Sequence, residues 1–470
     1  MPFSGTGTGI QNANDVFFSG LAQDNVLRYN NTTAKWNNLP LSVTTNDLAA
    51  SSVTEPKLSI ANSPASGNVL SWNGTSLQWV APTSGSGQRD CLLIAASNAP
   101  ASLKATADYV CDGTSDQVEI NAALTSAAYT DNGGLNWAKV QLSGGTFSIS
   151  APIQMQTGTW LCGSGHLTIL ESSGAGMNGR GVIELKDKDV FLSSVSNLTL
   201  EGNYAAGGAS HGIIYRNCDG AFLTAKPSGP PDPSGNYSLT PGNSPDSSHY
   251  ITDIFVHAFS GTGTRHGIVM DADVKDPKLS RIRVKFASGS GVYINDSSDG
   301  KYVQIIVQGA DQYGYYVDGA SNMFANCKAA YCDIDGWVVT SSRTMMTGCA
   351  AQDNGRHGLR LQSASDTCIN GFVSDANRRL DNAGYGVYVN SFNNSVFEGL
   401  HVSNRPQTIS KQQIKGLYLN SANITDSLIT GFVRVGTDTS GESPVQITGT
   451  VGTNCFARIV RENNGIYAAN

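Results

Sequence analysis

The chain has 470 residues, a formal net charge of −7 and only 14 % charged residues. Because the balance is acidic and no basic cluster is expected, phosphate-driven nucleic-acid binding is excluded as a main function. No run of about 18 apolar residues occurs, so no membrane-spanning helix and no membrane insertion are expected.

The first expected unit covers residues 1–87 and contains one motif twice. Residues 25–36 and 68–79 both begin with Asn-Val-Leu and both end in Trp. Each copy predicts a small β-hairpin with Trp at its end, and Asn73-Gly74 supplies a strong turn signal for the second copy. Since an isolated hairpin is marginally stable in water, the pair favours packing against other subunits.

The rest of this unit carries weaker signals. Short helical turns are expected around Leu48 and Lys57, and the composition predicts a linker at 82–87. The first residues lack a basic start and an apolar stretch, so no signal peptide is expected.

After the linker, residues 88–435 predict an all-β solenoid. Eight segments read glycine, apolar, any residue, apolar, and most recur at a period within the range of about 20 to 50 residues that marks solenoids. Because each unit is a short strand, the solenoid is a parallel β-helix, and each glycine is expected to admit a positive φ where the chain turns. The segments begin at Gly212, Gly267, Gly291, Gly314, Gly336, Gly358, Gly386 and Gly416.

Two parts of the chain depart from this repeat. A proline-rich stretch at 219–249 predicts a loop insertion, and both a recognition role and packing on a neighbouring subunit are open for it. Residues 436–470 are expected to form a terminal cap that covers the open edge of the last coil.

The chain has nine cysteines and no Cys-x-x-Cys pair. We therefore expect buried free thiols rather than a zinc site, and no other metal or cofactor is expected.

The middle residue of each glycine segment is expected to point away from the core, because alternate residues of a strand face opposite sides. Exposed aromatic residues suit stacking on sugar rings, and they equally suit an interface between subunits. Both uses are open for the column formed by Tyr293, Tyr316, Arg360, Tyr388 and Tyr418.

Any catalytic acid on the central coils is expected to be Asp, because Glu is absent from residues 202–397. Asp311 and Asp333 each lie three residues before a segment glycine, so neighbouring coils place them about 4.8 Å apart. That separation suits the carboxyl pair of a retaining glycoside hydrolase, with one pKa raised by the other charge. Asp335 and Asp353 widen the cluster, and ordinary turn aspartates are the alternative interpretation.

Two motifs carry a resemblance to known families. The Asp-Gly-x-x-Asp turn at 112–116, with a helix expected near 115–127, resembles the opening of the pectate-lyase-like superfamily, and 140–149 resembles its first coil. The paired N-terminal motifs resemble virion-proximal modules of bacteriophage tail spikes and tail fibres. The resemblance covers 1–87 and 88–435 and implies a right-handed parallel β-helix in a homotrimer.

Proteins of this kind bind, and often cut, polysaccharide on the host surface. The resemblance implies a phage tail spike or fibre, a minor tail protein of the virion that contacts other tail proteins through residues 1–87. A binding-only adhesin, a glycan depolymerase and a secreted bacterial polysaccharide lyase are the three alternatives. The absent signal peptide and the repeated hairpins argue against the lyase.

Overall fold

In the computed structural model the chain divides into two compact units, Met1–Gly87 and Gln88–Asn470, which are described separately. The predicted linker at 82–87, residues 219–248 of the insertion, Leu48, Lys57 and Cys218 lie outside the described residues. The structure describes residues 16–17, 25–30, 32, 35–40, 69–72, 75–80, 91–128, 139–173, 177, 179–185, 193–202, 210–216, 249–259, 263–272, 274–377, 380, 384–403, 415–420, 424–435, 445–448, 454–461 and 466–469.

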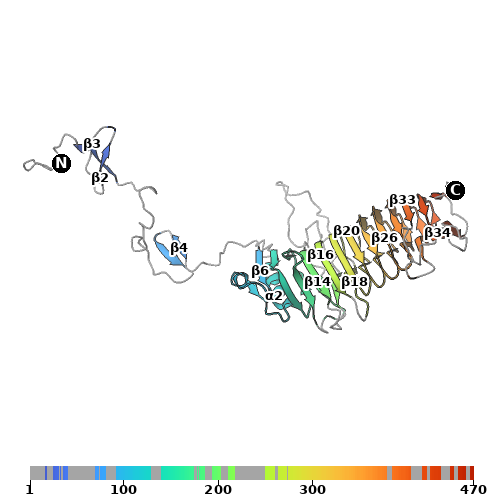
Figure 1. Ribbon diagram of the computed structural model, residues 1–470, viewed down its shortest axis with the longest axis horizontal. Coiled ribbons are helices and arrows are strands. Elements are labelled where there is room, and N and C mark those ends of the chain that lie inside the picture. The colour runs from blue at the N-terminus through green and yellow to red at the C-terminus, as the bar shows by residue number, and fades with distance from the viewer. Residues whose placement is uncertain are drawn as a thin grey trace, which may run out of the picture. The chain divides into compact units, whose positions relative to one another are not determined.

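Both repeated motifs of the first unit form antiparallel hairpins (Figure 1). Strands β2 (Asn25–Asn30) and β3 (Lys35–Pro40) form the first, and β4 (Val69–Trp72) and β5 (Leu77–Val80) form the second. β1 (Val16–Phe17) adds to β3 in parallel. The copies differ in register, because Trp36 pairs with Tyr29 near the start of β3, whereas Trp79 pairs with Leu70 near the end of β5.

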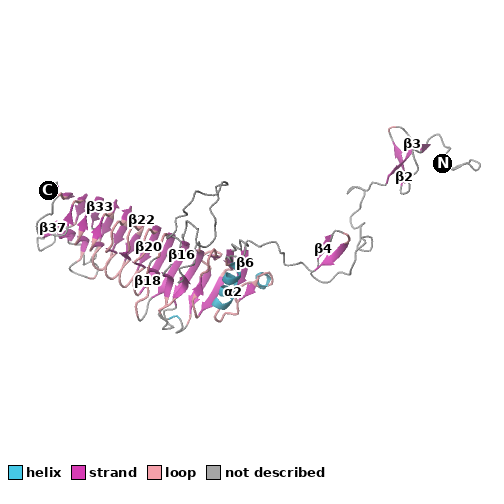
Figure 2. Cartoon of the chain, turned by 180° about the vertical axis from the view of Figure 1, so that it is seen from behind, coloured by secondary structure: helices cyan, strands magenta, loops and turns pink. Residues whose placement is uncertain are grey.

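The second unit opens with a helix-capped coil, which Figure 2 shows in cyan and magenta. Helix α2 (Gln117–Ala127) lies within the expected range, and its buried face includes Ile120 and Leu124. These side chains belong to the same apolar core as the solenoid, so the helix closes its first coil. The neighbouring elements are β6 (Cys91–Ala95), α1 (Ala101–Lys104), β7 (Tyr109–Val110), β8 (Lys139–Leu142) and β9 (Gly145–Ile149).

One wall of the solenoid is an 11-stranded parallel sheet, here called the glycine sheet, because eight of its strands contain or directly follow a segment glycine. Its strands stack in chain order, one per coil. They are β10 (Ile153–Gln154), β13 (Gly181–Leu185), β15 (His211–Arg216), β17 (Ile268–Asp271), β19 (Val292–Asn295), β21 (Tyr315–Asp318), β24 (Trp337–Val339), β27 (Leu359–Leu361), β31 (Tyr385–Val389), β34 (Lys415–Asn420) and β37 (Val445–Thr448).

The other large wall is a 20-stranded sheet, here called the bent sheet, because a left-handed residue interrupts it on most of its coils. These residues include Asp253, Arg281 and Gln304, with φ of 57°, 52° and 55°. Beyond β6 to β9 its strands are β11 (Trp160–Cys162), β12 (Thr168–Ser172), β14 (Ser194–Gly202), β16 (His249–Phe259), β18 (Pro277–Ala287), β20 (Lys301–Gln308), β22 (Met323–Ala325), β23 (Lys328–Ala330), β25 (Met345–Thr347), β26 (Ala350–Gln352), β29 (Cys368–Asn370), β30 (Val373–Asp375), β33 (Val396–Ser403), β36 (Leu428–Arg434), β38 (Phe456–Arg461) and β39 (Ile466–Ala469).

A third corner carries a short ladder of β28 (Ala364–Ser365), β32 (Phe392–Asn393) and β35 (Ile424–Thr425). Here too each coil bends at a left-handed residue, among them Asp366, Asn394 and Asp426. The Asn394 amide donates to the Asp366 carboxylate at 2.5 Å, so neighbouring coils are also joined by side chains. Asp and Asn suit these bends because they tolerate the left-handed region.

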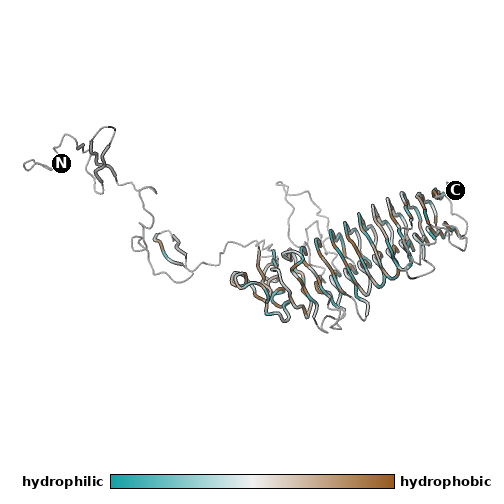
Figure 3. Tube along the Cα trace, in the orientation of Figure 1, coloured by the Kyte–Doolittle hydropathy of each residue, from teal (hydrophilic) through white to brown (hydrophobic). Residues whose placement is uncertain are grey.

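The inward residues form one continuous apolar core, and polar and apolar stretches alternate around the coils in Figure 3. The segment glycines serve close packing, so the expectation of a positive φ was wrong. A Cβ on Gly314 would lie 2.5 Å from the Gly336 carbonyl oxygen and 2.5 Å from the Ala329 Cβ. Gly212, Gly267, Gly291, Gly336 and Gly358 are equally crowded, and none of the six has a left-handed φ.

The solenoid runs past residue 435, where the cap was expected to begin. β37 continues the glycine sheet by pairing with β34, and β38 continues the bent sheet by pairing with β36. Among the described residues after 435, β39 alone departs from the pattern, since it pairs antiparallel with β38. The last coil is therefore a regular coil, and β39 lies along one edge of β38.

The described cysteines are all free thiols, of which Cys327 and Cys349 lie in the core on successive coils. No helix among the described residues has the length and apolar character needed to span a bilayer.

Candidate functional site

The strand register of the glycine sheet places all five predicted outward residues in a single file. Tyr293 pairs with Tyr316, and Arg360, Tyr388 and Tyr418 continue the file on later coils. Val338 stands between the two groups, paired with both Tyr316 and Arg360. These five predicted residues are called the tyrosine column below.

The aromatic rings of the tyrosine column stack on one another. The ring centroids of Tyr293 and Tyr316 are 5.1 Å apart with planes at 11°, and those of Tyr388 and Tyr418 are 4.8 Å apart with planes at 2°. His266 covers the other face of Tyr293 at 4.5 Å, and His357 stacks on Tyr388 at 4.9 Å. Because these faces are occupied, Tyr293 and Tyr388 present edges rather than faces to a ligand.

A row of histidines beside the column links the coils through their rings. His211 Nδ1 accepts the backbone N–H of His266 at 2.9 Å, and His266 Nδ1 accepts that of Ser290 at 2.8 Å. His357 Nδ1 accepts the N–H of Tyr385 at 3.0 Å. Only an unprotonated nitrogen accepts, so the rings are neutral. Burial is the main reason that the pKa values of His211 and His266 fall to about 4.

Asp335 occupies the same row and is fully buried. Its carboxylate accepts two bonds from Arg356, at 2.9 and 2.7 Å, and one from the His357 N–H at 3.1 Å. Arg360 completes the charge cluster, with its Nε 3.0 Å from the carboxylate and its guanidinium over the Tyr313 ring. This arrangement holds coils together and leaves Asp335 poorly placed to exchange a proton with a substrate.

Asp311 and Asp333 occupy the same turn on successive coils, because the Asp333 N–H donates to the Ala310 carbonyl and the Asp311 N–H donates to the Ala287 carbonyl. Both residues are exposed. The part of the Asp311 carboxyl that is buried raises its pKa most, and the nearby charge of Asp333 raises it further. Asp353 lies elsewhere. It follows Gln352, which pairs with Ala330, so its equivalent on the previous coil is Tyr331 rather than Asp333. The structure therefore pairs two of the four predicted acids and separates the other two from them.

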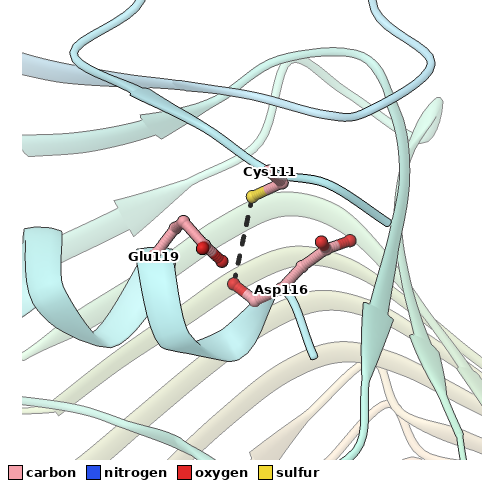
Figure 4. Close-up of side chains that lie close together, drawn as sticks. All are labelled: Cys111, Asp116 and Glu119. Carbon is pink, nitrogen blue, oxygen red and sulfur yellow. Dashed lines mark hydrogen bonds between the residues drawn. The ribbon is translucent and has the colours of Figure 1, made fainter. Parts of the chain in front are cut away.

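Near the N-terminal cap, Cys111, Asp116 and Glu119 place one ligand atom each within 4.8 Å of one another (Figure 4). The Asp116 carboxylate accepts the N–H of Gly113 and of Ser148, each at 2.8 Å. The Cys111 thiol donates to the Asp116 carbonyl at 3.9 Å. Burial and the two carboxylates raise the Cys111 pKa. The cluster therefore fastens the Asp-Gly-x-x-Asp turn to the first coil.

The bent sheet carries a dense group of positive charges on its outward side, so the expectation that the chain has no basic cluster was wrong. Across β16, β18, β20, β22 and β23 there are six Lys and Arg and one acid, Asp253. All five strands lie within the described residues. The six are called the basic face and comprise Lys278, Arg281, Arg283, Lys285, Lys301 and Lys328.

Exposed aromatic rings accompany these charges. Tyr250 is 40 % exposed and Phe286 is 48 % exposed. The ammonium of Lys278 lies 4.9 Å from the centroid of the Tyr250 ring, and that of Lys285 lies 5.9 Å from the Phe286 ring. Within the described residues these two rings therefore neighbour cations, whereas Tyr388 of the glycine sheet lies between other rings.

Comparison with known proteins agrees with this fold. The family model described as "Right handed beta helix region" matches residues 266–407. No curated protein matches the sequence. The enzymatically active domain of tailspike protein 2 from bacteriophage CBA120 matches with a TM-score of 0.53 at 16 % identity, covering 72 % of this chain and 50 % of that one.

Two further tailspike structures match similarly. Full-length tailspike protein 2 from an Escherichia coli bacteriophage gives a TM-score of 0.52 at 16 % identity, over 72 % of this chain and 44 % of its own. The gp42 tailspike of an Acinetobacter phage gives 0.50 at 12 % identity, over 76 % and 61 %. The chain thus spans about half the length of the first tailspikes it matches. It contains a right-handed parallel β-helix that is structurally similar to phage tailspikes.

Proposed function

We propose that this protein is a bacteriophage tail spike or fibre that attaches to the tail through residues 1–87 and recognises a polysaccharide on the host surface. The observation that carries the proposal is the fold likeness to tailspikes over 72 % of the chain. The separate hairpin unit supports an attachment role, since isolated hairpins need a partner surface for stability. The virion is then the site of action.

The test is direct decoration of cells. Fluorescently labelled full-length protein is incubated with a panel of bacterial strains, and binding is competed with polysaccharide extracted from each strain. Staining of one strain that its own polysaccharide abolishes is the expected result. Staining that survives removal of surface polysaccharide, or staining of no strain, contradicts the proposal.

Within the same proposal, the chain forms a homotrimer and the tyrosine column serves contact between copies. The supporting observation is that Tyr293 and Tyr388 have their faces covered by neighbouring rings, which leaves a flat row of edges rather than a stacking platform. Aromatic residues are enriched at subunit interfaces. Native mass spectrometry of the full chain tests this, with a trimer expected and a monomer contradicting it.

Cleavage of the glycan is a second candidate activity, favoured by the pair Asp311 and Asp333. Their equivalent places on successive coils suit a carboxyl pair, and the pKa of Asp311 is raised in the direction that a general acid requires. The test is release of reducing ends from the host polysaccharide. Loss of release in Asp311→Asn and in Asp333→Asn, with Asp366→Asn as a matched turn control, is expected. Unchanged release in both variants removes this site.

A further inference from the structure

We propose that the basic face of the bent sheet binds an acidic polysaccharide, one whose sugars carry carboxylate groups. It rests on the polysaccharide recognition proposed above and deepens it, because it names the binding surface and the chemical class of the polysaccharide. The first observation is the concentration of charge. Six basic side chains and one acid lie on adjacent strands of a chain whose net charge is −7.

The register holds like charges side by side. Lys278 pairs directly with Lys301 on the next coil, at the strand spacing of about 4.8 Å. Like charges directly opposite on neighbouring strands destabilise a sheet. The single acid on these strands is already engaged, since Asp253 accepts two bonds from Arg281, each at 2.7 Å. An anionic ligand relieves the repulsion that remains.

The charges also follow the direction of the solenoid. Lys278 and Lys301 are one coil apart, and Arg283 and Lys328 are two coils apart through Ile306, about 10 Å by the same spacing. A linear polymer that crosses these coils therefore meets two cations along either column, on adjacent coils in the Lys278 column and on alternate coils in the Arg283 column. The Tyr250 and Phe286 rings next to Lys278 and Lys285 add apolar surface beside a charge. A sugar ring with a charged substituent presents the same two features.

Charge density favours a glycan over nucleic acid. Duplex DNA carries one charge per about 1.7 Å of its axis, and the acidic remainder of this chain repels a polymer of that density. Binding to single strands uses rows of aromatic rings that stack on successive bases. In the described part of the bent sheet the His257 ring meets the Phe286 ring edge-on at 65° and the Phe255 ring at 31°, so these rings cover one another and offer no open stack for bases. A polymer with about one charge per sugar therefore fits better.

The experiment measures binding of the full-length chain to immobilised polygalacturonate and to neutral dextran of similar length. We expect binding to polygalacturonate only, with an affinity that falls steeply between low and physiological salt. The test variant is Lys278→Gln/Arg283→Gln/Lys301→Gln, and it is expected to lose at least about tenfold in affinity, as removal of three ionic contacts implies.

The matched control removes the same number of charges elsewhere, at the exposed residues Arg343, Arg434 and Arg458, each changed to Gln. We expect the control to remain within about twofold of the parent, and circular dichroism to show both variants folded. Equal losses in the two variants, or equal binding of dextran, overturn the proposal. Tighter binding of a single-stranded oligonucleotide overturns the choice of a glycan. A changed native mass in the test variant reassigns the face to contact between copies.

Discussion

On the glycine sheet, Tyr388 lies between His357 and Tyr418, at ring distances of 4.9 and 4.8 Å. On the bent sheet, Tyr250 is 40 % exposed and has a lysine ammonium over its ring. The same residue type thus joins coils on one wall and faces solvent on the other. The difference teaches that an outward tyrosine does not by itself provide a surface for stacking on sugars, because the register decides what covers its ring faces.

Charge follows the same division. Asp335, beside the glycine sheet, is fully buried and bonded to Arg356, so this charge is neutralised by a partner within the fold. Arg283 and Lys301 on the bent sheet are exposed. We infer that the glycine sheet provides cohesion and that the bent sheet provides binding. Four predictions sharpen this comparison.

Acid should destabilise the glycine sheet first. The pKa of His211 and of His266 is about 4 in the folded protein and about 6.5 when unfolded, so the unfolded chain binds protons first as pH falls. The contribution of each neutral histidine to the free energy of unfolding is fully present above pH about 6.5. It is lost as the pH falls toward 4, and the loss is about 3 kcal/mol for each histidine. Urea unfolding at several pH values measures this.

The matched change for this prediction is His266→Gln, which keeps an acceptor for the Ser290 N–H but cannot be protonated. It should weaken the acid dependence, whereas His401→Gln on the exposed side of the bent sheet should not. An acid dependence that is identical in the two variants contradicts the neutral-ring interpretation.

Replacing Asp335 should lower the free energy of unfolding by nearly as much. Asp335→Asn leaves Arg356 and Arg360 without their buried partner, and we expect the free energy of unfolding to fall by about 3 kcal/mol, the lower end for broken buried ion pairs because both guanidinium groups reach solvent. The control is Asp333→Asn, an exposed carboxylate two residues away. Denaturant midpoints that agree for the two variants show that Asp335 is not part of coil cohesion.

A methyl group at a segment glycine should have a smaller effect. Gly314→Ala places a Cβ against the Gly336 carbonyl oxygen and the Ala329 side chain, and overpacking of this kind costs about 1 to 3 kcal/mol. Gly144→Ala is the control, since a Cβ there meets nothing within 4 Å. Thermal unfolding compares the two, and a tolerated Gly314→Ala disproves the close-packing explanation.

Removing one ring from the stack should have the smallest effect. Tyr388→Leu loses stacking on His357 and Tyr418, which we expect to lower the free energy of unfolding by about 1 kcal/mol. Tyr250→Leu on the bent sheet should change stability little and should instead weaken polygalacturonate binding. Reversal of these two outcomes contradicts the division of roles between the walls.

The repeated units were predictable because a strand with one buried face must alternate, and the alternation recurs on every coil. The pairing of Asp311 with Asp333 was predictable for the same reason, since equal places in equal repeats meet. Asp353 could not be placed this way, because it precedes a glycine by five residues rather than three.

Other features depend on contacts between coils that sequence spacing does not reveal. The bond from the His266 N–H to His211 joins residues 55 positions apart across an irregular insertion, so sequence spacing does not reveal it. The role of Gly314 depends on the carbonyl of the next coil. The basic residues of β18 were visible in the sequence, but only pairing with β20 shows that Lys301 joins them.

The most direct measurement is hydroxyl-radical footprinting of the full-length chain with and without polygalacturonate, read at individual aromatic side chains. The division of roles predicts that the polymer protects Tyr250 and Phe286 and leaves the labelling of Tyr388 and Tyr418 unchanged. Protection of Tyr388 and Tyr418 alone would place the ligand on the glycine sheet and contradict the account.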